Sequence, residues 1–282
     1  MFKNSDNSKN NFVNQPGRLN LSEAVADIMS GLSCYSIWYT LALIDIKQRY
    51  RRSILGPFWI TINSSVIILM ITIVFSRILK IDLDVYVPFF ATGTIIWNFY
   101  STTLNESCGT FLAVDSLMRQ TRLPIFSHIM RVLCRNIFIF LHNFFVIIFV
   151  LIYFDKVPQI SSIIEFIIGL FIVIINLSMI AVPLAIISSR FRDVGQIIQN
   201  FIQAAYFITP IMWMPELIPM GKLSKILLFN PFNYYIEILR SPLLSQEVSS
   251  SSYIIILGIS VLLIIGAIAS LVYFKKRIVY WI

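Results

Sequence analysis

The feature that most constrains this chain is a series of six long apolar stretches separated by short polar segments. A helix needs about 20 apolar residues to cross the hydrocarbon core of a bilayer, so these stretches indicate membrane spans. Composition agrees, because 57% of the residues are hydrophobic and 13% are charged, whereas about 25% are charged in soluble domains. We therefore expect an all-α integral membrane protein with about six transmembrane helices. The expected spans are residues 55–79, 86–104, 132–154, 160–187, 197–213 and 253–274.

The distribution of basic residues predicts the orientation. If both termini are cytoplasmic, the cytoplasmic segments hold 16 of the 22 Lys and Arg residues. This excess agrees with the positive-inside rule. The net charge of +8 does not indicate nucleic acid, because the basic residues cluster beside apolar spans and not on a polar domain. We expect them to face membrane lipids.

The region before the first span predicts a helix that lies flat on the inner leaflet. Residues 33–54 place Tyr35 and Tyr39 on one helical face, with Lys47 and Arg51 opposite, as in interfacial amphipathic helices. A Gly-Pro pair then breaks the helix. The expected organisation is a polar cytoplasmic leader at 1–32, an amphipathic interface helix at 33–54 and a transmembrane domain at 55–282.

The segment between the fifth and sixth spans, residues 214–252, contains four prolines that divide apolar pieces too short to cross a membrane. Irregular backbone is tolerated at membrane depth where protein or a water-filled cavity satisfies it. We therefore expect a re-entrant hairpin on the periplasmic side that lines protein or a water-filled cavity.

Polar residues inside apolar spans need an explanation, because a polar side chain in hydrocarbon is costly. His142 and Asn143 should face other helices, where helix packing and transport are both open interpretations. Arg135 and Glu165 stand near span ends, where snorkelling to the interface is expected.

The fifth span combines polar residues, among them Gln199 and Gln203, with aromatic rings beside Pro210. An interfacial aromatic belt or helix packing accounts for most aromatic residues of a membrane protein. Hydroxyls of a passing glycan, however, need hydrogen-bonding partners, and its C–H faces lie well on flat rings. The predicted channel residues are Trp59, Tyr206, Phe207 and Trp213.

Signatures of catalysis are absent from the sequence. It has two histidines, no HExxH pattern, no GxSxG elbow and no Walker A motif. We expect no catalytic residue, no metal site and no cofactor in this chain. If transport uses ATP, a partner chain must bind it with magnesium and hydrolyse it. A polyprenyl-linked membrane transferase is a remote alternative, and so is a membrane scaffold without transport activity.

Six sequence segments in the same order resemble the permease subunits of type-2 ABC exporters, in particular those that export O-antigen polysaccharide of lipopolysaccharide. The resemblance extends from about Tyr35 to the C-terminus. It is carried by IDIKQRYRRSILGPFWITI at 44–62, ATGTIIWNFYSTTLNE at 91–106, RQTRLP at 119–124, SSRFRDVGQII at 188–198, FITPIMWMPELIP at 207–219 and NPFNYYIEILRSPLL at 230–244.

This resemblance implies a homodimer that works with two copies of a separate ATPase. It also implies export of undecaprenyl-diphosphate-linked O-polysaccharide across the bacterial inner membrane; capsular polysaccharide or teichoic acid is the alternative cargo. Positive-inside topology alone also explains the arginines of the two cytoplasmic loops. The implied ATPase-coupling residues are Arg119, Gln120, Thr121, Arg122, Arg190, Arg192 and Asp193, and the implied periplasmic gate residues are Pro231, Tyr234, Tyr235, Glu237 and Arg240.

Overall fold

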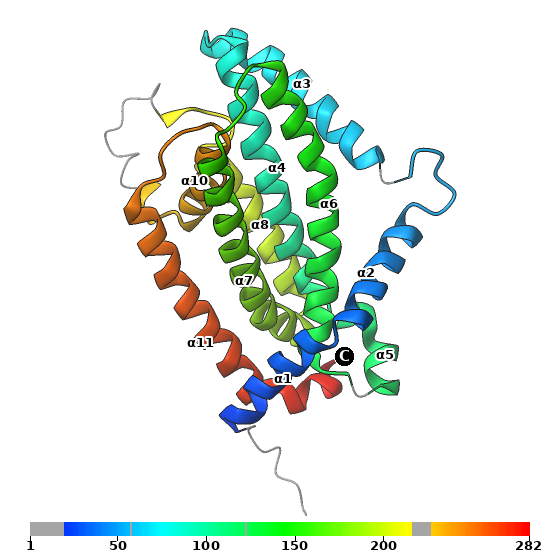
Figure 1. Ribbon diagram of the computed structural model, residues 1–282. Coiled ribbons are helices and arrows are strands. Elements are labelled where there is room, and N and C mark those ends of the chain that lie inside the picture. Colours follow the sequence, from blue (N-terminus) through cyan, green and yellow to red (C-terminus); the bar gives the residue numbers. More distant parts are fainter. Residues whose placement is uncertain (1–19, 57, 122, 216–226) are drawn as a thin grey trace, which may run out of the picture.

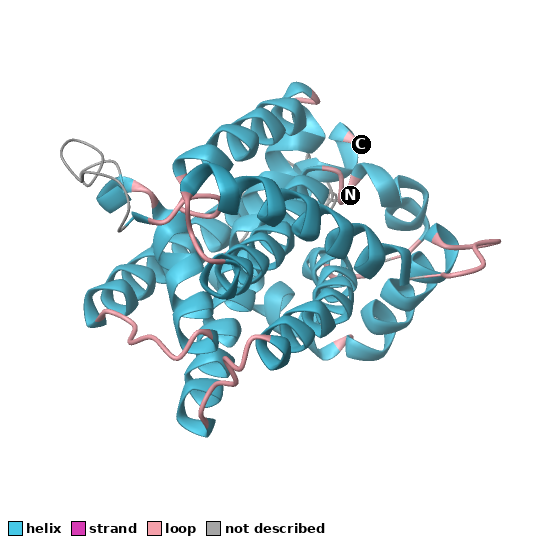
Figure 2. Ribbon diagram, turned by 90° about the horizontal axis from the view of Figure 1, so that it is seen from above, coloured by secondary structure: helices cyan, strands magenta, loops and turns pink. Residues whose placement is uncertain are grey.

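The computed structural model describes residues 20–56, 58–121, 123–215 and 227–282. Within these ranges every regular element is a helix (Figures 1 and 2). The elements are α1 (Leu21–Ser33), α2 (Tyr35–Arg49), α3 (Phe58–Leu79), α4 (Leu83–Cys108), the 3-10 turn η1 (Leu112–Val114), α5 (Asp115–Gln120), α6 (Ile125–Tyr153), α7 (Ile160–Arg190), α8 (Asp193–Ile208), α10 (Pro231–Leu243) and α11 (Ser250–Trp281).

Four of the described helices are long and apolar enough to cross a membrane: α3, α6, α7 and α11. This confirms the all-helical membrane architecture but not the count of six spans. The second expected span is α4, which is 26 residues long but more polar. The fifth is α8, which ends at Ile208 after 16 residues, because the chain reaches Pro210 and a proline cannot continue the hydrogen-bond ladder of a helix.

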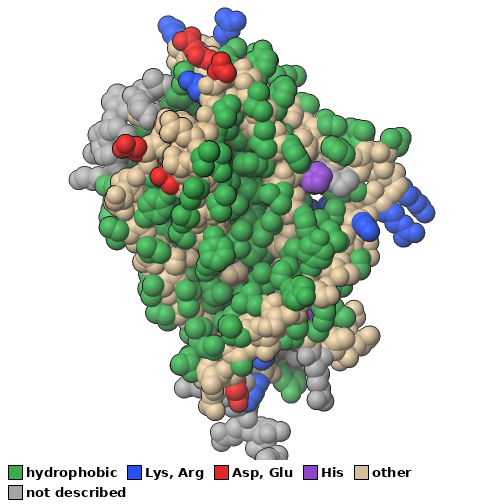
Figure 3. Space-filling view, in the orientation of Figure 1, with side chains coloured by type: hydrophobic (Ala, Val, Ile, Leu, Met, Phe, Trp, Pro, Cys, Tyr) green, Lys and Arg blue, Asp and Glu red, His purple; other side chains and the backbone are tan. Residues whose placement is uncertain are grey.

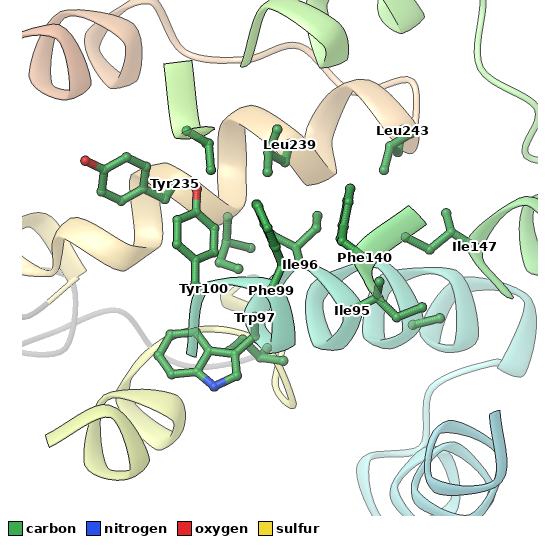
Figure 4. Packing of buried hydrophobic residues seen from close by; sticks show 14 of the residues in the cluster. Ile95, Ile96, Trp97, Phe99, Tyr100, Phe140, Ile147, Tyr235, Leu239 and Leu243 are labelled. Carbon is green, nitrogen blue, oxygen red and sulfur yellow. The ribbon is translucent and has the colours of Figure 1, made fainter. Parts of the chain in front are cut away.

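Helix α4 forms the centre of the bundle and packs against α3, α6, α7, α8 and α10. Its fully buried side chains include Phe90, Ile95 and Ile96. Figure 4 shows α4 side chains between α10 and α6, with Tyr100 directed toward Tyr235. The rings of these two tyrosines are 5.4 Å apart. Because neighbouring helices surround α4, it can also hold buried polar side chains such as Thr92 and Thr103, whose hydroxyls donate to main-chain oxygens one turn earlier.

The bundle has two distinct ends (Figure 1). One, the α5 end, carries α1, α5 and the C-terminus. The other, the α10 end, carries α10 and the α3–α4 and α6–α7 connections. Hydrophobic side chains cover the middle of the face seen in Figure 3, and charged side chains gather toward the ends and at the right, where Figure 1 shows the α2–α3 connection. This distribution suits a bilayer around the middle.

The last part of the expected polar leader at 1–32 is helical in the structure, where Leu21–Ser33 forms α1. Its buried face packs on the start of α6 and on α11. At Gly31 a Cβ atom would lie 2.7 Å from the Cβ of Phe126, so the close approach of the two helices requires glycine. Residues 1–19 of the leader lie outside the described ranges.

In the structure, the expected interface helix at 33–54 corresponds to α2 and the turn that follows it. Ala42 is its one buried residue, and the aromatic rings of Tyr35 and Tyr39 are exposed. Helix α10 is one arm of the expected re-entrant hairpin. Residues 216–226, which would form the other arm, lie outside the described residues, so the hairpin stays a prediction.

Candidate functional site

An ionic cluster joins α2, α4 and α6. The Asp45 carboxylate of α2 accepts hydrogen bonds from Arg131 Nη2 at 2.5 Å and from Arg135 Nη1 at 2.7 Å, both on α6. Arg135 Nη2 also lies 2.7 Å from Glu106 Oε2 on α4, and Arg49 Nη2 of α2 lies 2.7 Å from Glu106 Oε1. Five charged groups therefore hold three helices together.

The ionic cluster is largely shielded from solvent, with 11% of the Asp45 side chain and 14% of the Arg135 side chain exposed. Burial raises the pKa of Asp45, but the hydrogen bonds and charges of Arg131 and Arg135 outweigh it and hold that pKa below its ordinary value. Snorkelling, expected for Arg135, is thus wrong for this residue, because it finds two carboxylates inside the protein. Both acidic and basic residues stand in these three segments of the sequence, but their spacing does not show which of them meet.

The predicted ATPase-coupling residues lie together at the α5 end. Arg119, Gln120 and Thr121 are exposed at the end of α5, where Arg119 binds Asp115 and the main-chain oxygen of Ile282. Arg122 falls outside the described residues.

The second predicted coupling loop joins α7 to α8. Arg190, Arg192 and Asp193 are all exposed there, and the Arg190 guanidinium lies 5.2 Å from the Trp281 ring centroid. Trp281 and Ile282 thus lie between the two loops, a connection that the sequence did not predict. Exposed cations on two short connections are available to an acidic partner surface.

The predicted channel residues occupy different environments. Trp59 on α3 and Phe207 on α8 are exposed, by 52% and 64%. Tyr206 instead turns toward the core and packs on Trp97, with ring centroids 5.7 Å apart. Trp213 Nε1 donates to the main-chain oxygen of Phe207 at 3.1 Å. The four side chains therefore do not form one continuous wall in a single chain.

Helix α8 carries an outward face of mixed chemistry. Its exposed residues include both aromatic and amide side chains, and next to them an apolar groove of about 420 Å³ runs between α8 and α10. Phe201 and Phe232 line this groove, with rings 6.3 Å apart. The exposed residues of α8 are Asp193, Gln196, Ile197, Gln199, Asn200, Phe201, Gln203, Ala204, Phe207 and Ile208.

The predicted gate residues fix α10 to its neighbours. Pro231 is at the first turn of the helix, where the Asn230 side chain caps the Phe232 N–H at 3.0 Å. Tyr235 Oη accepts a hydrogen bond from Asn176 of α7 at 3.0 Å, and Tyr234 Oη donates to the oxygen of Leu228.

Two charged residues of α10 complete these attachments. Glu237 accepts hydrogen bonds from the N–H of Ser249 at 3.1 Å and the hydroxyl of Ser252 at 2.9 Å, at the start of α11. Arg240 is buried, and its guanidinium lies 4.0 Å from the Phe89 ring centroid. The gate residues thus connect α10 to α4, α7 and α11, so any movement of α10 would be transmitted to these helices.

Comparison with known proteins agrees with this architecture. Residues 37–244 match the family model of the ABC-2 type transporter. Two O-antigen export system permease proteins RfbA from Klebsiella pneumoniae are 24% and 25% identical, over 70% and 78% of this chain and 78% and 88% of their own lengths. An RfbA permease from Myxococcus xanthus is 21% identical over 60% of this chain and 65% of its own. The chain therefore belongs to the ABC-2 type transporter family, a family of transporter membrane subunits that work with a partner ATPase.

Proposed function

We propose that this chain is the permease of an exporter that moves undecaprenyl-diphosphate-linked O-antigen polysaccharide across the bacterial inner membrane. The likeness to O-antigen export permeases supports this cargo. In this proposal two copies of the chain pair with two ATPase subunits, which hold ATP and magnesium. α4 and α8 cross the membrane together with α3, α6, α7 and α11, and the α5 end faces the cytoplasm.

The observation that carries the proposal is the outward face of α8. Gln199, Asn200 and Gln203 are exposed on a helix of a membrane protein. In lipid, Gln199 and Gln203 would lack hydrogen-bond partners, and Asn200 would keep only the bond that its Oδ1 accepts from Gln196 Nε2 at 3.2 Å. Water in a channel between two copies of the chain would satisfy them, and the neighbouring rings of Phe201 and Phe207 would contact the apolar faces of sugars.

The two ends of the bundle would then act in sequence. The ATPase would bind the exposed residues of α5 and of the α7–α8 loop, and movement there would be carried along α7 and α8 to α10. A transporter needs two states that ATP binding favours unequally. The contacts of α10 with α4, α7 and α11 would hold the gate in one of these states.

Thiol accessibility tests the position of α8. Gln203→Cys, in a protein whose native cysteines are replaced, should react with a water-soluble maleimide in assembled complexes. Ile202→Cys is the matched control, since the neighbouring Ile202 is buried against the rest of the bundle. Equal, slow labelling at both positions would place Gln203 against protein or lipid and remove the channel assignment.

A further inference from the structure

A separate cavity of about 230 Å³ lies between the end of α2 and the helices α3, α4 and α6. It is distinct from the outward face of α8 and from the gate residues of α10. Its wall is unusual for the interior of a membrane bundle, because uncharged polar side chains from three helices line it. These are Asn63 and Ser64 of α3, Asn98 and Thr102 of α4, and Asn136 and Asn143 of α6.

The inner wall of the cavity has unmet hydrogen-bonding capacity. Asn136 and Asn143 are 2% and 4% exposed, and neither side-chain oxygen has a hydrogen-bond partner. The orientation of Asn136 is fixed, because its Nδ2 donates to Glu106 Oε2 at 2.9 Å and to the oxygen of Val132 at 3.1 Å. A buried acceptor that is left unpaired destabilises the fold. An occupant that donates hydrogen bonds would remove this destabilisation.

The cavity reaches the surface where α2 ends and α3 begins. Asn63 is exposed there, and 43% of the Arg49 side chain is exposed. The Arg49 guanidinium is already bound to Glu106 in the ionic cluster. The remaining lining is uncharged, and the rings of Phe99 and Phe140 add apolar surface. Amide oxygens, hydroxyls and rings together suit a ligand with hydroxyl groups and apolar C–H faces.

We propose that this cavity binds the uncharged, hydroxyl-bearing end of one head group of a membrane amphiphile. Hydroxyl groups would donate to the side-chain oxygens of Asn136 and Asn143. Cavities that hold drug-sized ligands are about 300–1,000 Å³, so this smaller volume suits a single head group and not a polymer. The group has two sources, the glycerol of phosphatidylglycerol or the first sugar of a lipid-linked glycan. Only the second source rests on the proposed function.

Native mass spectrometry of the full chain tests the proposal, in a detergent that has neither a sugar nor a glycerol head group. The probes are phosphatidylglycerol, phosphatidylethanolamine and a polyprenyl-diphosphate-linked monosaccharide. Asn143→Leu should weaken binding of the hydroxyl-bearing probe by about tenfold, as expected for one lost buried hydrogen bond. Ser64→Ala should weaken binding of this probe less than Asn143→Leu does. It replaces Asn143→Leu in the test if that variant does not fold. Ser65→Ala is the matched control, because its hydroxyl bonds to the oxygen of Thr61 and does not line the cavity.

Each outcome decides the matter. If the chain prefers phosphatidylglycerol to phosphatidylethanolamine and the cavity variants lose this preference, the ligand is a glycerol head group. If the chain prefers the saccharide probe to phosphatidylethanolamine and the cavity variants lose that preference, the ligand is a sugar. Equal binding of all three probes, unchanged by Asn143→Leu and Ser64→Ala, would overturn the proposal and leave a cavity that holds water only. If this happens while polysaccharide export remains normal, the proposed function stands and the binding site alone fails.

Discussion

The guanidinium of Arg240 in α10 donates a hydrogen bond to the main-chain oxygen of Pro210 at 2.7 Å. This bond joins the gate helix to the place where α8 stops. Pro210 cannot extend α8, and a carbonyl group near such a break needs a donor. Tyr86 of α4 supports the same segment, because its hydroxyl donates to the oxygen of Met212 at 2.6 Å.

Replacing Arg240 by methionine should lower both stability and export. The variant keeps an apolar stem but loses the donor to Pro210 and the cation over Phe89. Hydrogen bonds from charged groups contribute about 1.5–3 kcal/mol, so the melting temperature in detergent should fall by several degrees. Arg277→Met, on the exposed end of α11, is the control and should melt like the wild type. An unchanged melting temperature for Arg240→Met would show that the contacts of Arg240 add no net stability to the attachment of α10.

Acid should weaken the ionic cluster through Asp45. Because the pKa of Asp45 is lowered in the folded protein from its ordinary value of 3.8, its charge stabilises the fold above that value. This stabilisation is lost as the pH falls through the lowered pKa. Thermal unfolding followed from pH 6 to pH 3 should therefore show a steeper loss of stability for the wild type than for Asp45→Asn. Parallel curves for the two proteins would mean that Asp45 contributes no net stabilisation.

The contact of α1 with α6 should be sensitive to a single methyl group. Gly31→Ala would place a Cβ atom 2.7 Å from the Cβ of Phe126 and 2.9 Å from the backbone nitrogen of Ser127, so the helices must separate. Gly258→Ala is the control, because its Cβ would meet no atom within 4 Å and alanine favours a helix by about 1 kcal/mol. We expect faster proteolysis of the N-terminal helix for Gly31→Ala only. Similar cleavage of both variants would contradict the close packing of α1.

Separation of these helices would also break a charged contact. Asp27 of α1 accepts the N–H of Phe126 at 3.1 Å and lies 2.6 Å from Lys275 of α11. It therefore caps the N-terminus of α6 from another helix and binds the end of α11 at the same time, which explains a buried carboxylate at this position.

Charge reversal in the two predicted coupling loops should impair ATPase binding, whereas charge reversal elsewhere at the α5 end should not. Arg119→Glu and Arg192→Glu should reduce copurification of the ATPase and ATP-dependent export, while the chain still inserts into the membrane. Arg277→Glu reverses a charge at the same end but outside both loops, and should leave ATPase binding intact. If all three variants bind the ATPase equally, the loops are not its docking surface.

The sequence predicted the helical membrane architecture because long apolar stretches leave few alternatives. It did not predict α1, because the buried face of this helix consists of Ala24, Asp27 and Gly31, and such small or charged residues do not mark a buried face in the sequence. It placed the end of the fifth span too late, because the apolar residues Ile211 and Trp213 continue after the proline that ends α8.

Site residues were harder to derive from the sequence for a different reason. Charges at 45, 106, 131 and 135 meet only after three helices pack, and sequence distance gives no indication of that meeting. Tyr206 and Phe207 are neighbours with similar rings, yet one packs on Trp97 and the other is exposed. The rotation of α8 about its own axis, relative to α4, decides which ring faces outward. A single sequence indicates that rotation only approximately.

The most direct test of the central claim is the location of the polysaccharide after the chain is depleted in its host. Lipid-linked polymer should accumulate at the cytoplasmic face of the inner membrane while surface polysaccharide falls, and wild-type protein but not Gln203→Leu should restore export fully. Normal surface polysaccharide in depleted cells, without accumulated lipid-linked polymer, would contradict a role of this permease in polysaccharide export.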